Sequence, residues 1–293
     1  MGNRMMREGS VECVHPGGTH RMAFTEWGDP ANLRVLVCAH GLTRCGRDFD
    51  DLARAMADEY RVVCPDVAGR GQSDWLPDPN LYSLPQYGAD MLTLIAALAP
   101  RQLDWVGTSM GGLIGMGLAA QAPGSSLFPI NRLVLNDVGP VITAASLKRI
   151  GQYLGNAPRF DSYEQIEGYV RAVSPGFGQL SDAQWQHLTT HVVRRAEDGK
   201  FEFLYDPAIA VTYVQALIAS GGQDIDFWPL YDMITCPTLL LRGETSDLLT
   251  RETAEAMTIR GPQAQLIEIQ GVGHAPPLMV AGQIEVIRDF LLA

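Results

Sequence analysis

The sequence has little of what would place the protein in a membrane or send it out of the cell. It contains no run of about 18 apolar residues, the length that a membrane-spanning helix needs. Its first ten residues, MGNRMMREGS, lack the apolar stretch of a signal peptide. We therefore expect a cytoplasmic protein with no membrane partner.

Cysteine and metal-ligand patterns are also scarce. The five cysteines are an odd number without CxxC spacing, which argues against a disulfide framework and against a zinc site. Cys38 and Cys64 lie in apolar runs and are typical of small core residues. His187 and His191 are four residues apart, but Leu188 stands where a zinc protease has glutamate. We expect no metal and no other cofactor.

Basic residues are in the minority. The chain has 22 Lys and Arg against 33 Asp and Glu, a net charge of −11, and no basic block. A nucleic-acid backbone or an anionic lipid surface needs the opposite pattern, so neither is expected as a partner. With 293 residues, 46% of them hydrophobic, the chain can bury a full core. It is expected to act as a monomer or homodimer on a small molecule.

What the sequence does have is a series of short, β-branched apolar runs that alternate with helix-like stretches. This alternation predicts an α/β fold whose sheet is mostly parallel and covered by helices on both faces. Ligands of such sheets bind at the carboxyl ends of the strands. The strand-like runs cover residues 21–28, 33–40, 60–66, 103–107, 132–137, 237–243 and 264–271, and the helix-like stretches cover residues 49–59, 84–98, 110–121, 251–257 and 283–292.

One interval breaks this alternation. Residues 139–231 contain no strand-like run of the same apolar kind and are helix-like and rich in aromatic residues. We predict that they form a helical cap inserted over the carboxyl edge of the sheet. The core domain then consists of residues 1–138 and 232–293. Most of the aromatic residues are expected to pack the cap against this core.

The stretch LDWVGTSMGG, residues 103–112, ends a predicted strand with a serine between glycines. Ser109 could be only the N-cap of the next helix. The pattern Gly-x-Ser-x-Gly between a strand and a helix is also that of a nucleophile elbow, where the glycines allow a sharp turn and the serine is exposed at its tip. The helix N-terminus there favours developing negative charge.

A serine nucleophile needs a base, and the base needs a carboxylate to orient it. His274, in GVGHAP just past the last strand, lies where a base could reach across the edge of the sheet. Asp247, in RGETSD after the penultimate strand, is the favoured acid because of its place in the chain and in the loop. Asp137, in LNDVGP, is the alternative acid, and its other possible role is to hold the chain where the cap begins.

The loop AHGLTR, residues 39–44, ends another strand and is the candidate oxyanion loop. The backbone amides of Leu42 and Met110 could form a two-donor oxyanion hole. Gly41 is a candidate substrate-binding residue beside them. His40 is expected to hold the loop rather than to act as a second base.

The motifs HGLTR, PDVAGRGQSD, GTSMGG, RGETSD and GVGHAP, in this order and over nearly the whole chain, resemble those of the α/β-hydrolase superfamily. The resemblance implies Ser109 as nucleophile, Asp247 as acid, His274 as base, and the amides of Leu42 and Met110 as oxyanion donors. It is closest to the capped bacterial branch of esterases, enol-lactonases and carbon–carbon bond hydrolases.

The same resemblance makes the PDVAGRGQSD motif a structural turn, so Arg70 and Asp74 receive no catalytic role. A serine at the elbow argues against the haloalkane dehalogenase and epoxide hydrolase branches, which have aspartate there.

Three functions stay open at this point. The favoured one is hydrolysis of a small carboxylic ester through an acyl-serine. The second is hydrolysis of a carboxylated catabolic intermediate, an enol-lactone or a diketone, in which Arg44 or Arg47 would pair with the substrate carboxylate. Both arginines could equally hold the loop or lie at the surface. The third is a ligand-sensing protein that keeps the triad without turnover.

Overall fold

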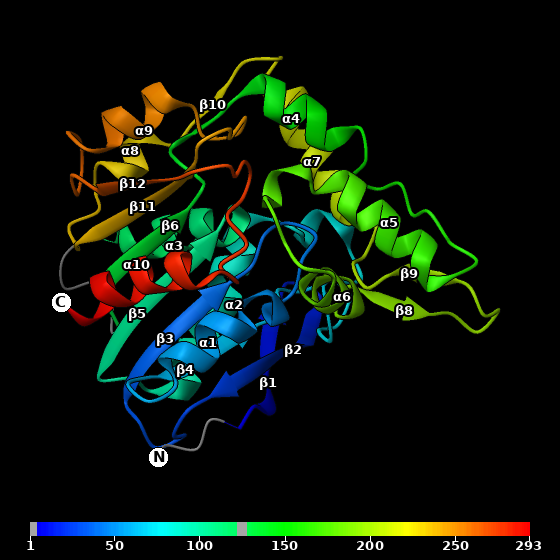
Figure 1. The fold of residues 1–293 in the computed structure, drawn as a ribbon, viewed down its shortest axis with the longest axis horizontal. Helices are drawn as coiled ribbons and strands as arrows, with labels where there is room; N and C mark the ends of the chain where they lie inside the picture. Colours follow the sequence, from blue (N-terminus) through cyan, green and yellow to red (C-terminus); the bar gives the residue numbers. More distant parts are fainter. Residues whose placement is uncertain (1–4, 122–127) are drawn as a thin grey trace.

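The structure, a computed structural model, describes residues 5–121 and 128–293. Its centre is an eight-stranded sheet in the order β1-β2-β4-β3-β5-β6-β11-β12 (Figure 1). β1, β2 and β4 pair antiparallel, and every pair from β4 to β12 is parallel. The strands are β1 (Arg7–His15), β2 (Gly18–Trp27), β3 (Arg34–Ala39), β4 (Arg61–Pro65), β5 (Gln102–Thr108), β6 (Ile130–Asn136), β11 (Thr238–Gly243) and β12 (Gln265–Ile269).

Helices cover both faces of the sheet, which confirms the predicted fold class. In β3, Leu36 and Cys38 pack into the apolar layer of α1 and α10, whereas Val35 and Val37 pack into the layer of α2 and α3. This follows from the alternation of side chains along a strand, and a strand buried on both faces is apolar at every position. The core helices are α1 (Asp50–Met56), α2 (Leu84–Leu98), α3 (Met110–Ala119), α9 (Arg251–Met257) and α10 (Ala281–Leu292), with one-turn helices η1 (Gly46–Phe49) and η2 (Pro79–Leu81).

One strand of the sheet was not predicted. β1 pairs with β2 in a hairpin at the edge of the sheet, and the burial of its side chains alternates along most of its length. An edge strand with one exposed face needs few apolar residues, so the polar stretch REGSVECVH carries a weak strand signal. The first four residues, part of the stretch considered for a signal peptide, lie outside the described residues.

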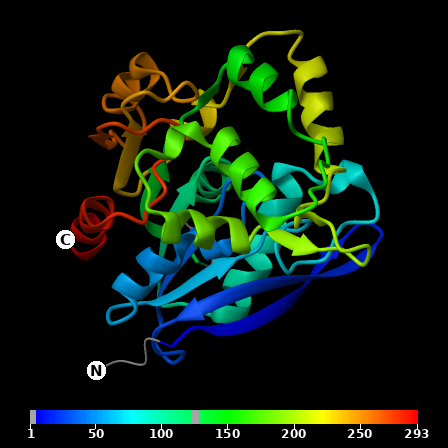
Figure 2. The same ribbon diagram turned by 45° about the vertical axis from the view of Figure 1, so that its right-hand side comes forward.

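Between β6 and β11 the chain leaves the sheet and builds an insertion beyond the carboxyl ends of the parallel strands (Figures 1 and 2). The insertion is not only helical as expected, because it also holds two short antiparallel pairs, β7 with β10 and β8 with β9. Its elements are β7 (Val141–Ile142), α4 (Ala144–Gly151), α5 (Tyr163–Val173), η3 (Pro175–Phe177), α6 (Asp182–Thr190), β8 (Val193–Arg195), β9 (Phe201–Phe203), α7 (Ile209–Ala219), β10 (Ile225–Asp226) and α8 (Trp228–Tyr231).

Hydrogen bonds join the insertion to the core on two sides of the sheet edge. The Tyr82 hydroxyl donates to Asp206 at 2.6 Å, and the Asp206 amide donates to the carbonyl of Gly69 at 2.8 Å. On the other side, the amide of Gly273 donates to the carbonyl of Gly176 in η3 at 2.7 Å. The loop after β12 is therefore in direct backbone contact with the insertion.

Across residues 5–121 and 128–293, every helix is too short or too polar to cross a lipid bilayer.

Candidate active site

Ser109 occupies the tip of the sharp turn between β5 and α3, as predicted. Its backbone has φ +52°, the left-handed region that side chains disfavour. A Cβ at Gly107 would lie 2.3 Å from the carbonyl oxygen of Gly111, and one at Gly111 would lie 2.0 Å from that of Ala39. Ser109 holds the N-cap position, but its side chain makes no capping hydrogen bond. Its hydroxyl is therefore available for another partner.

That partner is His274. Nε2 of His274 lies 3.1 Å from Oγ of Ser109, and Nδ1 lies 2.8 Å from Oδ2 of Asp137. The carboxylate can only accept, so Nδ1 carries the proton and the lone pair of Nε2 faces the serine hydroxyl. The structure therefore brings Ser109 and His274 together, as the sequence predicts.

Asp137 is fully buried at the end of β6, where it has φ +54°. Besides His274, its carboxylate accepts a hydrogen bond from the amide of Gly243 at 2.8 Å and one from the hydroxyl of Ser246 at 2.6 Å. Three donors thus satisfy a carboxylate that has no access to water, as a buried charge requires. They also hold it in one orientation against the histidine.

The favoured placement of Asp247 is corrected by this geometry. The side chain of Asp247 is 53% exposed and pairs with Arg149, with 2.5 Å between Oδ2 and Nε. The loop after β11 instead turns Ser246 inward, onto the carboxylate of Asp137. Both aspartates lie at the carboxyl edge of the sheet, but only the alternative acid, Asp137, reaches His274.

His40 holds the loop after β3, the candidate oxyanion loop, as expected. Its Nε2 accepts from the amide of Val67 at 2.9 Å, so Nδ1 carries the proton and donates to the carbonyl of Gly41 at 2.7 Å. Complete burial lowers the pKa of His40 to about 4, so the ring is neutral. Because the peptide is planar and trans, fixing the Gly41 carbonyl also fixes the direction of the Leu42 amide.

Arg70 supports the same loop from the other side. It is fully buried and donates to the carbonyl of Leu42 at 2.8 Å and to the hydroxyl of Tyr87 at 2.8 Å. Asp74 accepts from the amide of Arg21 at 2.8 Å. The contacts of Arg70 and of Asp74 are structural.

Met110, the first residue of α3, has one of the amides that a helix leaves without an intrahelical acceptor.

Two cavities meet at Ser109. The first, the arginine cavity, has about 140 Å³ and is lined by Arg44, Ser109, Arg149 and His274, among others. The second, the apolar cavity, has about 360 Å³, and its lining includes Ser109, Met110 and many apolar side chains of α4, α7 and the core. A substrate centred on the serine can therefore extend in two directions, between core and insertion.

Comparisons with known proteins agree with this architecture. The model of the Alpha/beta hydrolase family matches residues 36–283. The chain belongs to the alpha/beta hydrolase family. A 3-hydroxybutyrate-oligomer hydrolase of Cupriavidus necator is 48% identical over 290 residues, 97% of each chain. A 2-(acetamidomethylene)succinate hydrolase of Mesorhizobium japonicum is 25% identical over 82% of this chain and 81% of its own. The crystal structure of an alpha/beta hydrolase from Novosphingobium aromaticivorans has a TM-score of 0.83 and 33% identity, over 98% of this chain and 99% of its own.

In this hydrolase, the two arginines considered from the sequence are held by neighbouring carboxylates. Arg44 lines the arginine cavity, but two of its nitrogens bind Asp48, at 2.6 and 2.8 Å. Arg47 binds Asp50 in the same way and lines neither cavity. Gly41 lines the arginine cavity, and a Cβ at this position would lie 3.8 Å from the Cβ of Ser109.

Sequence reasoning missed Arg149. This residue lies on α4 in the insertion and lines the arginine cavity beside the serine. Nothing in its local sequence distinguishes it, because Lys148 and Arg149 together are typical of the basic last turn of a helix. Only the packing of the insertion over the sheet brings it to the site.

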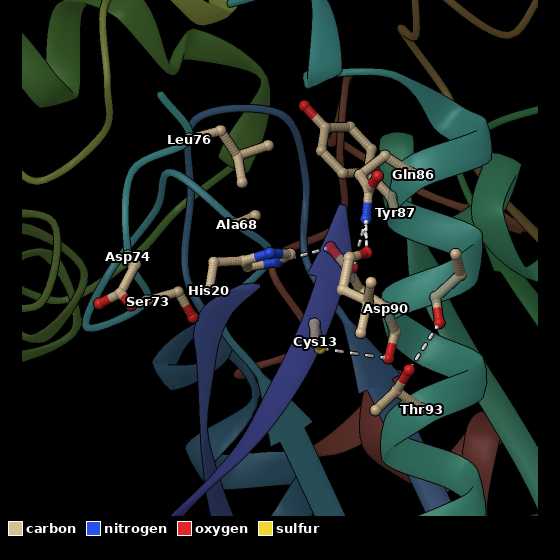
Figure 3. A network of polar contacts seen from close by, with 12 residues as sticks. Cys13, His20, Ala68, Ser73, Asp74, Leu76, Gln86, Tyr87, Asp90 and Thr93 are labelled. Carbon is tan, nitrogen blue, oxygen red and sulfur yellow. Dashed lines mark hydrogen bonds and ion pairs between the residues drawn. The ribbon is translucent and has the colours of Figure 1, made fainter. Parts of the chain in front are cut away.

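Figure 3 shows a buried polar cluster between the β1–β2 hairpin and α2. Cys13, His20 and Asp90 offer ligand atoms that lie within 4.8 Å of one another. Protein contacts engage the carboxylate and one histidine nitrogen: Asp90 pairs with Nε2 of His20 at 3.1 Å and accepts from Gln86 at 2.7 Å, whereas Nδ1 of His20 has no hydrogen-bond partner among the described residues. Burial, with the charge of Asp90, raises the pKa of Cys13 to about 12, which keeps it a thiol. We interpret the cluster as a link that fastens the hairpin.

A second group could present ligands to a metal, namely Asp50, His187 and His191. Here the guanidinium of Arg47 forms an ion pair with the carboxylate of Asp50, and Nε2 of His187 donates to the backbone carbonyl of Arg47 at 2.9 Å. Burial and the charge of Arg47 lower the pKa of His191 to about 4. A fixed cation at this position opposes a metal ion, and the expected absence of a metal stays a prediction.

Proposed function

We propose that this hydrolase cleaves a small carboxylic ester through an acyl-serine, with Ser109 as nucleophile, His274 as base and Asp137 as the acid that orients the base. The observation that carries the proposal is the continuous series of contacts from Ser109 Oγ through the imidazole to Asp137, at 3.1 and 2.8 Å. An exposed serine hydroxyl is unreactive unless a base removes its proton, and a neutral imidazole in this tautomer can do so.

In the first half of the reaction, Oγ of Ser109 attacks the ester carbon while Nε2 of His274 takes the hydroxyl proton. The bond between the acyl carbon and the alcohol oxygen then breaks, and the departing alkoxide receives that proton from His274. In the second half, water adds to the acyl carbon, His274 takes a proton from it, and Ser109 recovers the proton when the acid leaves. Asp137 stabilises the imidazolium in both halves.

We propose the amides of Leu42 and Met110 as the oxyanion hole. The His40 and Arg70 contacts that hold the carbonyls on either side of the Leu42 amide support this assignment, because an oxyanion donor must already point in the right direction before the charge develops. Met110 supports it as the first residue of α3, where the amide is unsatisfied within the helix and lies at the positive end of the helix dipole.

We also propose that residues 139–231 form a cap domain over a core of residues 1–138 and 232–293. The insertion supplies Arg149 and Tyr153 to one cavity and Tyr213 and Phe227 to the other. Closure by such a segment favours a small substrate. The relative in Cupriavidus necator suggests the substrate class: esters between short hydroxy acids, as in 3-hydroxybutyrate oligomers.

Hydrolysis of a carboxylated catabolic intermediate is the second candidate. Arg44 and Arg149 in the lining of the arginine cavity favour this candidate, since an enol-lactone acid or a dicarboxylate would need a cationic partner. The Mesorhizobium japonicum relative acts on a succinate derivative by its name, but at 25% identity this likeness is much weaker. A substrate panel separates the two candidates.

The first experiment compares Ser109→Ala with the wild type on p-nitrophenyl esters from acetate to decanoate, 3-hydroxybutyrate dimer and trimer, several lactones and an anionic diketone. We expect Ser109→Ala to lose about 10³-fold or more in kcat on every substrate that the wild type cleaves. A fluorophosphonate probe should label the wild type at the Ser109 peptide, as read by mass spectrometry.

Ser10→Ala, an exposed position on β1, is the matched control and should behave as the wild type in both assays. Residual Ser109→Ala activity within tenfold of wild type, or probe labelling elsewhere, would remove Ser109 from this role. Turnover confined to lactones or the diketone would replace the favoured substrate class with the second one.

A further inference from the structure

The arginine cavity has a charge opposite to that of the whole protein. The chain has a net charge of −11, yet the fully charged residues among the described lining of this cavity are Arg44 and Arg149, with no aspartate or glutamate. The described lining of the apolar cavity contains no charged residue. Cationic side chains in an otherwise acidic protein, gathered beside the nucleophile, indicate a negatively charged part of the substrate.

Arg149 is better placed than Arg44 to receive that charge. The Arg44 side chain is 13% exposed, and its Nε and Nη2 are taken up by Asp48 and by the carbonyl of Leu188. The Arg149 side chain is 41% exposed and meets Asp247 along one edge, through Nε and Nη2. Arg149 also makes a side-chain hydrogen bond with Tyr153. A guanidinium has five N–H donors, so donors remain for a substrate carboxylate beyond these two partners.

The guanidinium of Arg149 also acts within the cavity. Tyr153 lines the same cavity, and although burial raises its pKa, the positive charge of Arg149 opposes that rise. Asp247 lines neither cavity, and its two contacts with Arg149 hold the guanidinium. The aspartate that the sequence suggested for the triad therefore serves to position a cation at the site.

The catalytic groups assign the two ends of the substrate to the two cavities. His274 lines the arginine cavity and is absent from the described lining of the apolar one. The leaving alcohol must lie on the side of the base, because the same nitrogen gives it a proton. Of the two proposed oxyanion donors, Leu42 lines both cavities and Met110 lines only the apolar one, which is the larger at about 360 Å³. The acyl chain therefore belongs there.

We propose that the hydrolase binds esters whose leaving alcohol carries a carboxylate, and that Arg149, positioned by Asp247, binds this carboxylate in the arginine cavity while the acyl chain fills the apolar cavity. This inference rests on the proposed ester hydrolysis. For a linear hydroxy-acid oligomer it sets the direction of cleavage. Serine attacks the last ester bond, the unit with the free carboxylate leaves as the hydroxy acid, and the remaining acyl chain stays on Ser109 until water releases it.

The test compares two substrates that differ only in charge: 3-(butyryloxy)butyrate and its carboxamide, 3-(butyryloxy)butyramide. We measure kcat and KM for both with the wild type and with Arg149→Gln. The wild type should prefer the carboxylate. Arg149→Gln should reduce that preference about 10- to 100-fold, the effect of losing a charged hydrogen-bonded pair, mainly through a higher KM.

Asp247→Asn should reduce the preference in the same direction by a smaller factor, since the arginine stays but loses its support. Arg159→Gln is the control: Arg159 is also 41% exposed, lies in the insertion and pairs with Asp198, but lines neither cavity. It should leave the preference unchanged. Equal kcat/KM for the two substrates in the wild type, or an Arg149→Gln loss that is the same for both, would overturn the proposal.

These failures differ from failure of the proposed function, in which the wild type would cleave neither substrate in a Ser109-dependent way. The direction of cleavage is tested with a 3-hydroxybutyrate trimer that carries ¹³C in the unit with the free carboxylate. The first monomer released should be labelled, as read by mass spectrometry at early times. An unlabelled first monomer would reverse the assignment of the two cavities.

Discussion

The two sides of the site are built differently. On the sheet side, Asp137 and His40 are completely buried, and hydrogen bonds hold both side chains. On the insertion side, Arg149 is 41% exposed and is held by one ion pair with Asp247, itself 53% exposed. A buried, fully bonded group has one orientation, whereas an exposed pair is screened by water and can adjust.

Under the proposed function, this difference separates the catalytic groups from those that recognise the substrate. Groups that handle the proton and the developing charge must be aligned before the substrate arrives, because reorganisation during the reaction would cost rate. A group that binds a distant part of the substrate can move as the substrate enters. We therefore expect changes on the sheet side to act on every substrate, and changes on the insertion side to act on anionic substrates alone.

The largest effect is expected at Asp137. Asp137→Asn keeps the size of the side chain but can present an N–H to Nδ1 of His274, which favours the wrong tautomer. We expect kcat to fall about 10³- to 10⁴-fold for neutral and anionic esters alike. Steady-state kinetics with p-nitrophenyl butyrate and 3-(butyryloxy)butyrate measure both.

Asp247→Asn is the matched comparison, because Asp247 also follows a strand at the carboxyl edge of the sheet. Its loss of kcat on p-nitrophenyl butyrate should be smaller than that of Asp137→Asn by at least a factor of 100. The opposite order of the two variants would return the triad acid to Asp247.

A smaller effect is expected in the pH dependence of stability, through His40. Its folded pKa of about 4 lies below the ordinary value of 6.5, so the unfolded chain binds the proton more readily. Stability from this group is fully present above pH 6.5 and is lost as the pH falls to 4. The total is roughly 3 kcal/mol, of which about 2 kcal/mol is lost by pH 5.

Urea unfolding of the wild type and of His40→Asn at pH 7.5 and pH 5 isolates this contribution, because every other ionisable group is common to both proteins. The wild type should lose about 2 kcal/mol more than the variant between these pH values. An equal loss in the two proteins would show that His40 is not held neutral.

The smallest effect concerns salt. Raising NaCl from 0.05 to 0.5 M, an about threefold shorter screening length, should raise KM for 3-(butyryloxy)butyrate a few-fold. The KM for the carboxamide and both kcat values should change little, because Asp137 is fully buried and the side chain of His274 is only 17% exposed. A fall in kcat for both substrates would mean that the sheet side is screened as well, and that the two sides do not differ as described.

The sequence was informative where local chemistry decides the structure. The predicted helices over residues 84–98 and 251–257 match α2 and α9 residue for residue. The glycines around Ser109 predicted the turn correctly, because a side chain at either flanking position would collide with backbone atoms. His40 was correctly expected to hold its loop.

The sequence was less informative where side-chain direction decides. Asp137 and Asp247 both follow a strand at the same edge, so position in the chain cannot separate them. The two aspartates are distinguished by the φ of +54° at Asp137 and by the inward turn of Ser246, and neither feature leaves a signal in the sequence. Arg149 and the short strands β8 and β9 were missed for a related reason, since distant packing brings the first to the site and the strands are three residues each.

The contact between η3 and the loop after β12 limits how the hydrolase can be altered. A Cβ at Gly176 would lie 2.7 Å from both the backbone nitrogen and the backbone oxygen of His274. Any side chain at this position would push on the backbone of His274, the proposed base. An insertion grafted from another member of the family would therefore have to reproduce this one glycine before it could bring a new specificity, so the two parts of the chain cannot be exchanged independently.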